Sequence, residues 1–425
     1  MKKTTVSTIA ALLLTGMLAG CGSNVNKEQP GQEASGGEQT VIRVAISGSE
    51  QEKQVRYDTA ELFMKAHPNI KIEWVDLGSE RYQKTLTLIS GGNAPDILYM
   101  NEWTVPLAER GVLMPLDEMI EGDSDFDLNE FYPSVIDAYR VNGKLYGMPQ
   151  EISPYVIYYN KDLFDEANLP YPKDDWTEAQ FFDLAKKLTD PSKKQYGFLY
   201  ENYGAPLDGM LTRNNVEIYA DPAESRLDSA EALETLTNIR MLVDEKITPN
   251  PAEQQAAGQG SSEQFRNRQV AMFSAGMWYL PPFKQDPLPF NWDVVRMPNK
   301  QNQQTKVGAL SWSISKDTKH PEEAWEVLKF FVGPEGMKVV ASYNMALPAS
   351  ANKEANQIII DSGFPANVKA FVDSASDVRM TEFMNGKYSE INDVISEVMD
   401  KLLLGRLTPE EARQELIAKI KEKSS

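Results

Sequence analysis

Short runs rich in β-branched and aromatic residues alternate with longer amphipathic stretches along most of the chain. The run Val41–Ser47 predicts a strand, and Glu50–Ala66, with Leu62 and Phe63 on one face, predicts a helix. Ile70–Val75 predicts a second strand. Strands and helices that alternate in this way favour an α/β fold with largely parallel sheets.

Local turn and capping signals divide the pattern further. Asn142-Gly143 is typical of a tight hairpin turn between two extended segments. Thr177 and Gln180 have the spacing of a capping box, and Trp176 and Phe181 are placed to form a hydrophobic staple, so a helix begins there. The same reasoning predicts helices at 81–89 and 321–332 and strands at 95–100, 270–273 and 292–296.

The first twenty residues contain an apolar run that is too short to cross a membrane. Lys2 and Lys3 precede an apolar stretch that is shorter than the roughly 20 residues a spanning helix needs, so we interpret residues 1–20 as a secretory signal peptide. The stretch ends in Leu-Ala-Gly-Cys at Cys21, which resembles the bacterial lipobox. That resemblance implies cleavage before Cys21 and its acylation, including palmitate-type chains, which would hold the protein on a membrane.

Residues 21–39 contain almost no apolar side chains and predict a disordered tether. The roughly 385 residues that follow exceed what a single core usually accommodates, so two lobes are expected. We therefore expect a two-lobed body, acting as a monomer, held at the extracellular face of the bacterial cytoplasmic membrane.

The charge of the chain limits its partners. The formal net charge is -19, which makes nucleic acid and anionic lipid surfaces poor partners.

Because the chain has a single cysteine, the fold cannot depend on internal disulfides.

Sequence motifs for metals, cofactors and catalysis are not found. The acidic run at 123–129 begins like an EF-hand calcium loop, but Leu128 stands where that loop needs glycine, and Ser134 replaces the bidentate glutamate. The chain contains no nucleophile elbow, phosphate-binding loop or dinucleotide glycine pattern. We predict no metal site, no cofactor and no catalytic residues.

Several short segments occur in the order typical of one known family. In these segments the chain resembles the extracellular solute-binding proteins of ABC importers, in the group similar to maltose-binding protein. Each segment alone is weakly specific, but together they span most of the chain. They are residues 89–97 (ISGGNAPDI), 107–116 (LAERGVLMPL), 143–149 (GKLYGMP), 158–164 (YYNKDLF), 270–272 with Gly276 and Trp278, and 321–325 (PEEAW).

The resemblance implies a fold and a function. It implies an α/β, two-lobed, periplasmic-binding-protein-like fold of type II, with a ligand cleft between the lobes that closes about a hinge. Carried onto this chain, the first lobe takes residues 40–150 and 305–350, and the second takes 151–304 and 351–425. The implied function is capture of a carbohydrate, expected to be an oligosaccharide, and its delivery to an ABC permease.

Aromatic residues are the first candidates for the site, because sugars present apolar faces that stack on flat rings. Trp103 follows the third strand at its carboxyl end, where open α/β sheets bind ligands. The spacing of Trp278 matches a tryptophan that stacks on sugar in the resembling family, and Trp312 lies in a segment similar to a cleft-lining run of that family. An ordinary core position is the alternative for each of the three.

Polar candidates come from loops at the expected cleft. Ser49 and Glu50 follow the first strand, where Ser49 has the alternative role of a helix N-cap. The resemblance does not determine which polar residues contact the ligand. The other candidates are Asn101, Glu102, Glu151, Tyr155, Tyr200, Asn202 and Arg379.

Two other functions remain open at the level of sequence. A surface glycoside hydrolase or lyase would use two carboxylates at a defined separation, and the chain has many carboxylates. The same binding fold could instead hold a polyamine, a peptide or a metal chelate. The acidic charge favours a cationic ligand, whereas the aromatic loops favour a sugar.

Replacing Cys21 with serine should release the protein from membranes, because the acyl chains are attached through the thiol. In a bacterial host, we expect wild-type protein in the membrane fraction with incorporated palmitate label, and the Cys21→Ser variant in the soluble fraction without label. A Ser23→Ala control in the same segment should behave as wild type. Membrane retention of Cys21→Ser would contradict the lipoprotein interpretation.

Overall fold

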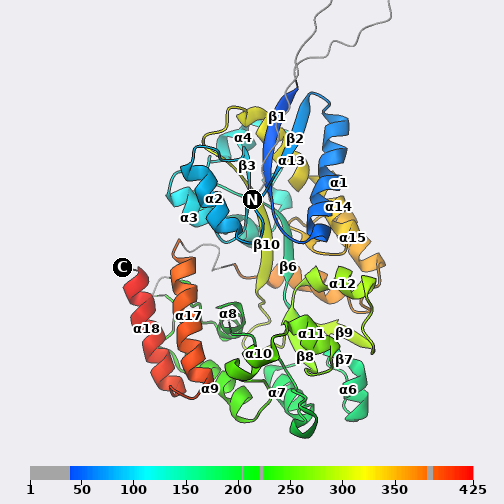
Figure 1. Cartoon of the computed structure of the whole chain (residues 1–425), viewed down its shortest axis with the longest axis vertical. Coiled ribbons are helices and arrows are strands. Elements are labelled where there is room, and N and C mark those ends of the chain that lie inside the picture. The colour runs from blue at the N-terminus through cyan, green and yellow to red at the C-terminus, as the bar shows by residue number, and fades with distance from the viewer. Residues whose placement is uncertain (1–38, 203, 221–223, 381–385, 425) are drawn as a thin grey trace, which may run out of the picture. The chain divides into compact units, whose positions relative to one another are not determined.

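The computed structural model describes residues 39–202, 204–220, 224–380 and 386–424 (Figure 1). The predicted signal peptide, Cys21 and the predicted tether, apart from its last residue, lie outside the described residues. None of the helices in the described ranges is long and apolar enough to cross a membrane.

A mixed sheet of six strands forms the first lobe, in the order β11-β6-β10-β3-β1-β2. β1 pairs in parallel with β2 and β3, whereas β10 runs antiparallel to both β3 and β6. The strands are β1 (Thr40–Ile46), β2 (Ile70–Asp76), β3 (Ile97–Met100), β6 (Met148–Pro154), β10 (Val307–Ile314) and β11 (Leu347–Pro348).

Helices cover both faces of this sheet. Figure 1 shows α2 and α3 on one side and α1 and α14 on the other. Phe63 of α1 and Phe331 of α13 are buried in the core against the sheet. The elements of this lobe include α1 (Glu50–Ala66), α2 (Arg81–Ser90), α3 (Thr104–Glu109), α4 (Asp117–Gly122), α5 (Pro133–Asp137), α13 (Pro321–Val332), α14 (Pro334–Ser342) and the hairpin β4 (Arg140–Val141) to β5 (Lys144–Leu145).

The second lobe is built on β8-β7-β9, a sheet of three strands. Both pairings are antiparallel, and β10–β3, β10–β6 and β11–β6 in the first lobe are antiparallel too, so the expectation of largely parallel sheets was wrong. Successive side chains of β7 point to opposite faces: Ile157 and Tyr159 join one core, and Val156 and Tyr158 join the other. The strands are β7 (Val156–Asn160), β8 (Met272–Ala275) and β9 (Trp292–Val295).

The C-terminal helices divide between the lobes. α17 and α18 pack against α9 in the second lobe, but α15 (Lys353–Asp361) packs against α14 and β11 of the first. The assignment of all residues 351–425 to the second lobe was therefore wrong for α15. The remaining helices are α6 (Lys161–Glu166), α7 (Glu178–Lys187), α8 (Gly204–Arg213), α9 (Ala230–Asp244), α10 (Pro251–Ala257), α11 (Ser261–Arg266), α12 (Leu280–Gln285), α16 (Lys369–Ser374), α17 (Tyr388–Leu403) and α18 (Pro409–Ser424).

Several local predictions are confirmed because they rest on short-range chemistry. α1 and α13 have the predicted bounds. Asn142 and Gly143 both adopt positive φ, at 50° and 78°, as a tight hairpin turn requires. Thr177 and Gln180 form the predicted capping box at the start of α7.

Three chain segments run side by side between the lobes, and Thr305 connects them. Its backbone N–H donates to Asp377 O at 3.0 Å, and its carbonyl accepts from Arg379 N at 2.9 Å. Its hydroxyl donates to Tyr155 O at 2.8 Å, while Tyr155 N donates to Lys306 O at 2.9 Å. These bonds place the segments around residues 155, 305 and 378 next to one another, where a hinge between the lobes would lie.

Gly197→Ala should destabilise the second lobe, because a Cβ there would stand 1.7 Å from the carbonyl oxygen of Ala185 in α7. Backbone must move to relieve such a clash, so we expect a loss of at least about 2 kcal/mol, measured by urea unfolding. The control Gly122→Ala meets no atom within 4 Å and should change stability little. Equal stability of the two variants would contradict this packing.

Candidate functional site

A cavity of about 300 Å³ lies between the lobes. Its walls come from the N-termini of α1 and α2, the end of β3, the crossing strands β6 and β10, and second-lobe segments after β8 and at α17. We call it the interlobe cavity. Its lining residues are Glu52, Arg81, Tyr99, Asn101, Glu102, Glu151, Ser153, Tyr155, Trp278, Val307, Gly308, Ala309, Leu310, Met345, Ala346 and Tyr388.

Trp278 and Tyr155 form an aromatic wall of this cavity. Trp278 lies in a short 3-10 turn (Met277–Tyr279) directly after β8, and its ring meets that of Tyr155 edge to face, with centroids 5.3 Å apart. The indole rests on two glycines. A Cβ on Gly276 would come within 2.1 Å of the ring, and one on Gly308 within 3.1 Å. Because Gly276 and Gly308 have no side chains, they leave the space that the indole ring occupies.

A buried ion pair positions Glu151 at the cavity. Arg56 of α1 donates from Nη2 to Glu151 Oε1 at 2.6 Å, and the two side chains are 2% and 14% exposed. The other carboxylate oxygen, Oε2, is buried and has no hydrogen-bond partner among the described residues. Asn101 Oδ1 is in the same situation. The cavity therefore contains two acceptors that are ready for a donor from outside.

Glu102 and Arg81 bring charge to the first-lobe side of the cavity. Burial raises the pKa of the Glu102 carboxyl, and the positive charge of Arg81 only partly opposes this. Arg81 lies over the ring of Trp103, with its guanidinium carbon 5.1 Å from the ring centroid. Trp103 in turn stacks on Tyr82, with centroids 4.9 Å apart. Trp103 is not part of the lining, but it packs against Arg81, which is.

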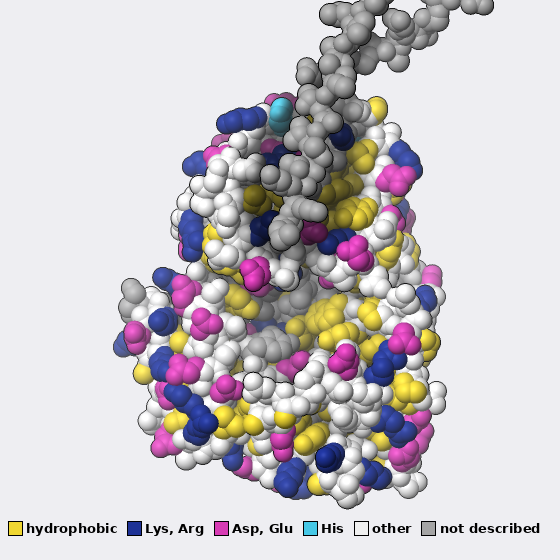
Figure 2. Space-filling view, in the orientation of Figure 1, with side chains coloured by type: hydrophobic (Ala, Val, Ile, Leu, Met, Phe, Trp, Pro, Cys, Tyr) yellow, Lys and Arg dark blue, Asp and Glu magenta, His cyan; other side chains and the backbone are white. Residues whose placement is uncertain are grey.

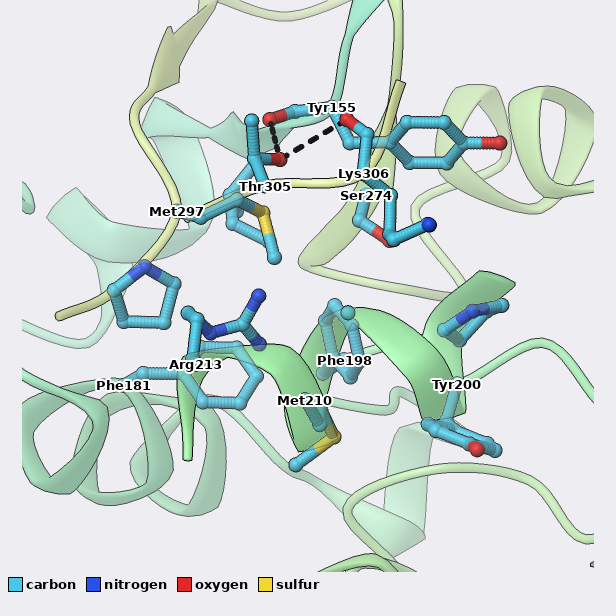
Figure 3. Close-up of a pocket in the computed structure, with 14 residues that line it drawn as sticks. Tyr155, Phe181, Phe198, Tyr200, Met210, Arg213, Ser274, Met297, Thr305 and Lys306 are labelled. Carbon is cyan, nitrogen blue, oxygen red and sulfur yellow. Dashed lines mark hydrogen bonds between the residues drawn. The ribbon is translucent and has the colours of Figure 1, made fainter. Parts of the chain in front are cut away.

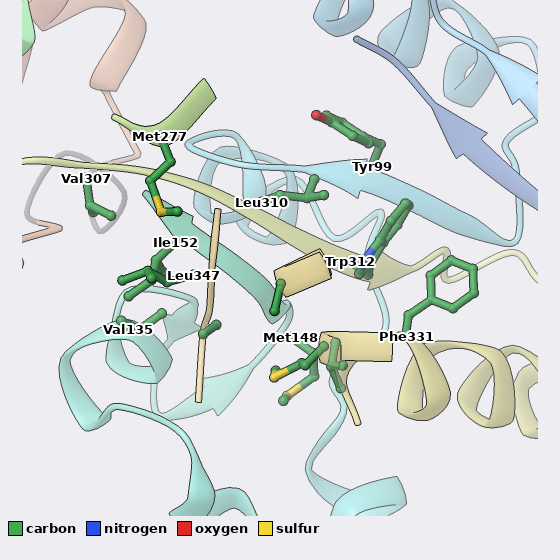
Figure 4. Close-up of a cluster of buried hydrophobic side chains, with 14 of the residues drawn as sticks. Tyr99, Val135, Met148, Ile152, Met277, Val307, Leu310, Trp312, Phe331 and Leu347 are labelled. Carbon is green, nitrogen blue, oxygen red and sulfur yellow. The ribbon is translucent and has the colours of Figure 1, made fainter. Parts of the chain in front are cut away.

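Trp312 lies in the core rather than in the cavity, so its predicted place at the ligand was wrong. The side chain is fully buried, and its indole N–H donates to Gln150 Oε1 at 2.9 Å. Its ring meets Tyr99 and Phe331 edge to face (Figure 4). The residues of β10 that line the cavity lie earlier in the strand, at 307–310, and the pairing of β10 with β6 shifts its register between Leu310 and Ser311, before Trp312.

The remaining predicted residues lie outside the cavity lining. Ser49 is the N-cap of α1, and its hydroxyl accepts from Glu52 N at 3.3 Å, so the N-cap alternative describes it. Glu50 is exposed and pairs with Lys53 at 3.3 Å. Tyr200 is buried in the second lobe, where burial raises its pKa, and Asn202 donates to Asp400 at 2.6 Å.

Arg379 belongs to the third crossing segment and is half-buried. Its Nε is buried without a hydrogen-bond partner in the described part of the chain. The structure thus brings together five of the predicted residues in the interlobe cavity: Asn101, Glu102, Glu151, Tyr155 and Trp278.

Sequence reasoning missed Arg81, Glu52 and Tyr388, which also line the cavity. Arg81 opens the helix that follows β2, and Glu52 lies in the first turn of the helix that follows β1. The rule that ligands bind beyond the carboxyl ends of strands could have found both. Tyr388 comes from a C-terminal helix, and no local signal connects it with this cavity.

Charges are mixed on the face seen in Figure 2, where acidic and basic side chains are interspersed. Among the described residues, no group of three or more His, Cys, Asp or Glu side chains is arranged to hold a metal ion. The interlobe cavity therefore offers a ligand aromatic faces, hydrogen-bond acceptors and one arginine.

Residues 47–338 match the family model described as bacterial extracellular solute-binding protein. An ABC substrate-binding protein from Listeria monocytogenes, solved in complex with cycloalternan, is 30% identical with a TM-score of 0.82, over 91% of this chain and 99% of that one. The galactooligosaccharide-binding protein of Bacillus subtilis is 23% identical over 69% of each chain. The sugar-binding protein MalE of Xanthomonas citri, 20% identical over 90% of this chain and 97% of that one, shares the fold with a TM-score of 0.78.

Glu102→Gln should stabilise the unliganded protein at neutral pH. A carboxyl whose pKa in the folded protein is raised above its usual value of 4.5 costs stability as pH rises through that value, and the cost is absent at lower pH. The gain of Glu102→Gln over wild type should therefore be larger at pH 7 than at pH 4 in thermal unfolding.

The control is Glu397→Gln, whose effect on stability should change with pH in the opposite direction. Hydrogen bonds from Lys401 and Lys419 lower the pKa of Glu397 to about 2, so its contribution to stability is present at neutral pH and lost in acid. A gain for Glu102→Gln that does not change with pH would mean that Glu102 is not a buried carboxylate.

Proposed function

The chain belongs to the family of bacterial extracellular solute-binding proteins, and we propose that it captures an oligosaccharide in the interlobe cavity and delivers it to an ABC permease. The observation that carries this proposal is the composition of the cavity. Trp278 and Tyr155 form an aromatic wall from one lobe and the crossing segment, and polar side chains of the other lobe face the same space.

The polar groups of the cavity match sugar hydroxyls. Each hydroxyl both donates and accepts a hydrogen bond, so it can donate to Asn101 Oδ1 or Glu151 Oε2, which have no partner among the described residues. Arg81 supplies donors, and the ring of Trp278 suits the apolar C–H face of a pyranose. A volume of about 300 Å³ is at the lower end of the range typical of small-molecule sites, and hinge motion would adapt it.

Three carboxylates line the cavity, which is the argument for a cationic ligand such as a polyamine. Two of them are already engaged, because Glu52 accepts from Ser49 N at 2.6 Å and Glu151 accepts from Arg56 at 2.6 Å. The third, Glu102, lies near Arg81, whose positive charge opposes the rise in pKa that burial of the carboxyl causes. The cavity thus offers little net negative charge, and the sugar is the better supported ligand.

The proposal includes no catalytic step. We propose that the protein binds its ligand unchanged, as a monomer held to the extracellular face of the cytoplasmic membrane through acylated Cys21. A tether of this kind keeps the effective concentration of a binding protein high beside its permease. The relatives from Listeria and Bacillus, one solved with cycloalternan and the other named for galactooligosaccharides, support an oligosaccharide as the class of ligand.

Calorimetry with a panel of linear and cyclic oligosaccharides, simple sugars and polyamines tests the proposal. We expect an oligosaccharide to bind, and Trp278→Ala to weaken it by roughly 10- to 100-fold, since a central aromatic contact contributes about 1.4 to 2.8 kcal/mol. The control Trp74→Ala removes another half-buried tryptophan, one that packs against Tyr57 outside the cavity, and should leave affinity unchanged.

Circular dichroism should confirm that both variants fold. Binding of a polyamine but no sugar would overturn the ligand class. Undiminished affinity of Trp278→Ala would overturn the site. Breakdown of the bound sugar, detected by chromatography, would contradict a function without catalysis.

A further inference from the structure

A second, smaller cavity lies inside the second lobe, directly behind the crossing segments. Its volume is about 30 Å³, which is enough for one or two water molecules or an ion of similar size and too small for a sugar. Phe181, Phe198 and Met210 form apolar walls, and Thr305 and Tyr155 close it on the hinge side (Figure 3). We call it the inner cavity.

The guanidinium of Arg213 points into this cavity (Figure 3). Arg213 is the last residue of α8 and only 3% exposed. Its Nε and Nη1 are buried and have no hydrogen-bond partner in the ranges that the structure describes. Leaving buried donors of a charged group unpaired costs several kcal/mol, so a partner inside the cavity is expected.

Carbonyls at the end of α8 would be the usual partners of such an arginine, but other donors occupy them. Leu211 O accepts from Asn214 N at 2.8 Å, and Thr212 O accepts from Asn215 N at 2.9 Å. The carbonyl of Arg213 itself accepts from Gln301 N at 3.1 Å. The guanidinium therefore finds no acceptor at its own helix terminus.

Among the described residues, no charged side chain forms a hydrogen bond with Arg213 Nε or Nη1 either. Lys306, which also lines the cavity, lies 2.5 Å from the buried carboxylate of Asp208. Glu178 is the acidic group whose charge acts on Arg213, and it also lies 3.6 Å from Lys300, but it forms no hydrogen bond with Arg213 Nε or Nη1. Burial lowers the pKa of Arg213 to about 10, so the guanidinium remains charged at neutral pH.

We propose that the inner cavity binds a small monovalent anion, chloride or bromide, on the Nε–H and Nη1–H groups of Arg213. Both Arg213 groups can only donate, so they suit an anion, which accepts from each of them. The Thr305 hydroxyl, which lines the same space, donates its proton to Tyr155 O at 2.8 Å and adds no donor for the ion; its oxygen could accept from a water, so the two occupants are distinguished by the anomalous signal of the ion. The bound ion would stabilise the second lobe where it meets the crossing segments, independently of any ligand in the interlobe cavity.

Crystals of the wild-type protein grown with sodium bromide test the site directly. We expect an anomalous peak in the inner cavity within hydrogen-bonding distance of Arg213 Nε and Nη1. An ordered water there without anomalous signal, or an empty cavity, would overturn the proposal. This measurement needs no variant, so it stays decisive if substitutions at Arg213 prevent folding.

Thermal unfolding in solution provides the second test. At equal ionic strength, replacing sodium methanesulfonate with sodium chloride should raise the wild-type midpoint by roughly 1 to 3 °C through mass action. Arg213→Met should lose this response, whereas Arg110→Met, at an exposed arginine outside this lobe, should keep it. An equal chloride response in wild type and Arg213→Met would overturn the proposal, whichever sugar the protein binds.

Discussion

The hydrogen bonds of Thr305 are the constraint on which the two-lobed arrangement depends. One buried residue bonds through its N–H, its carbonyl and its hydroxyl to both of the other segments that run between the lobes. Polar groups buried at such a place must all find partners, so the three segments are held in one register. Both cavities lie against these segments, and Tyr155 lines each of them.

The interlobe cavity follows from this arrangement together with the ends of the first-lobe strands. β3 delivers Asn101 and Glu102 to the cavity, and β6 carries Glu151, which Arg56 holds in place from behind. From the other lobe, Trp278 reaches the same space because Gly276 and Gly308 leave room for its ring. The result is an aromatic wall opposite acceptors that lack partners among the described residues, an arrangement suited to binding a polyhydroxylated ligand.

Where sequence reasoning succeeded, the signal was local or came from a known family. The capping box at Thr177 and the turn at Asn142-Gly143 depend on a few neighbouring residues, and both form as predicted. Trp278, which the family spacing implied as a ligand contact, lines the interlobe cavity, and its contact with a ligand stays a prediction. The prediction for Trp312 was wrong because the part of its strand that lines the cavity ends at Leu310, and Trp312 packs against Tyr99 and Phe331 in the core. The assignment of α15 to the second lobe was wrong because no local pattern in its sequence indicates which lobe it packs against.

By itself the sequence determined the alternation of strands and helices, the positions of the main helices, the family, and the prediction of an acylated Cys21. These depend on periodicity, caps and motifs, which are properties of neighbouring residues. Only the tertiary structure decided that Arg81 and Tyr388 line the same cavity and that Glu151 is paired with Arg56. It also decided that Arg213 Nε and Nη1 are buried at an inner cavity with no hydrogen-bond partner among the described residues. Contacts of this kind join residues far apart in the chain, and their burial and pairing are settled only when the elements pack together.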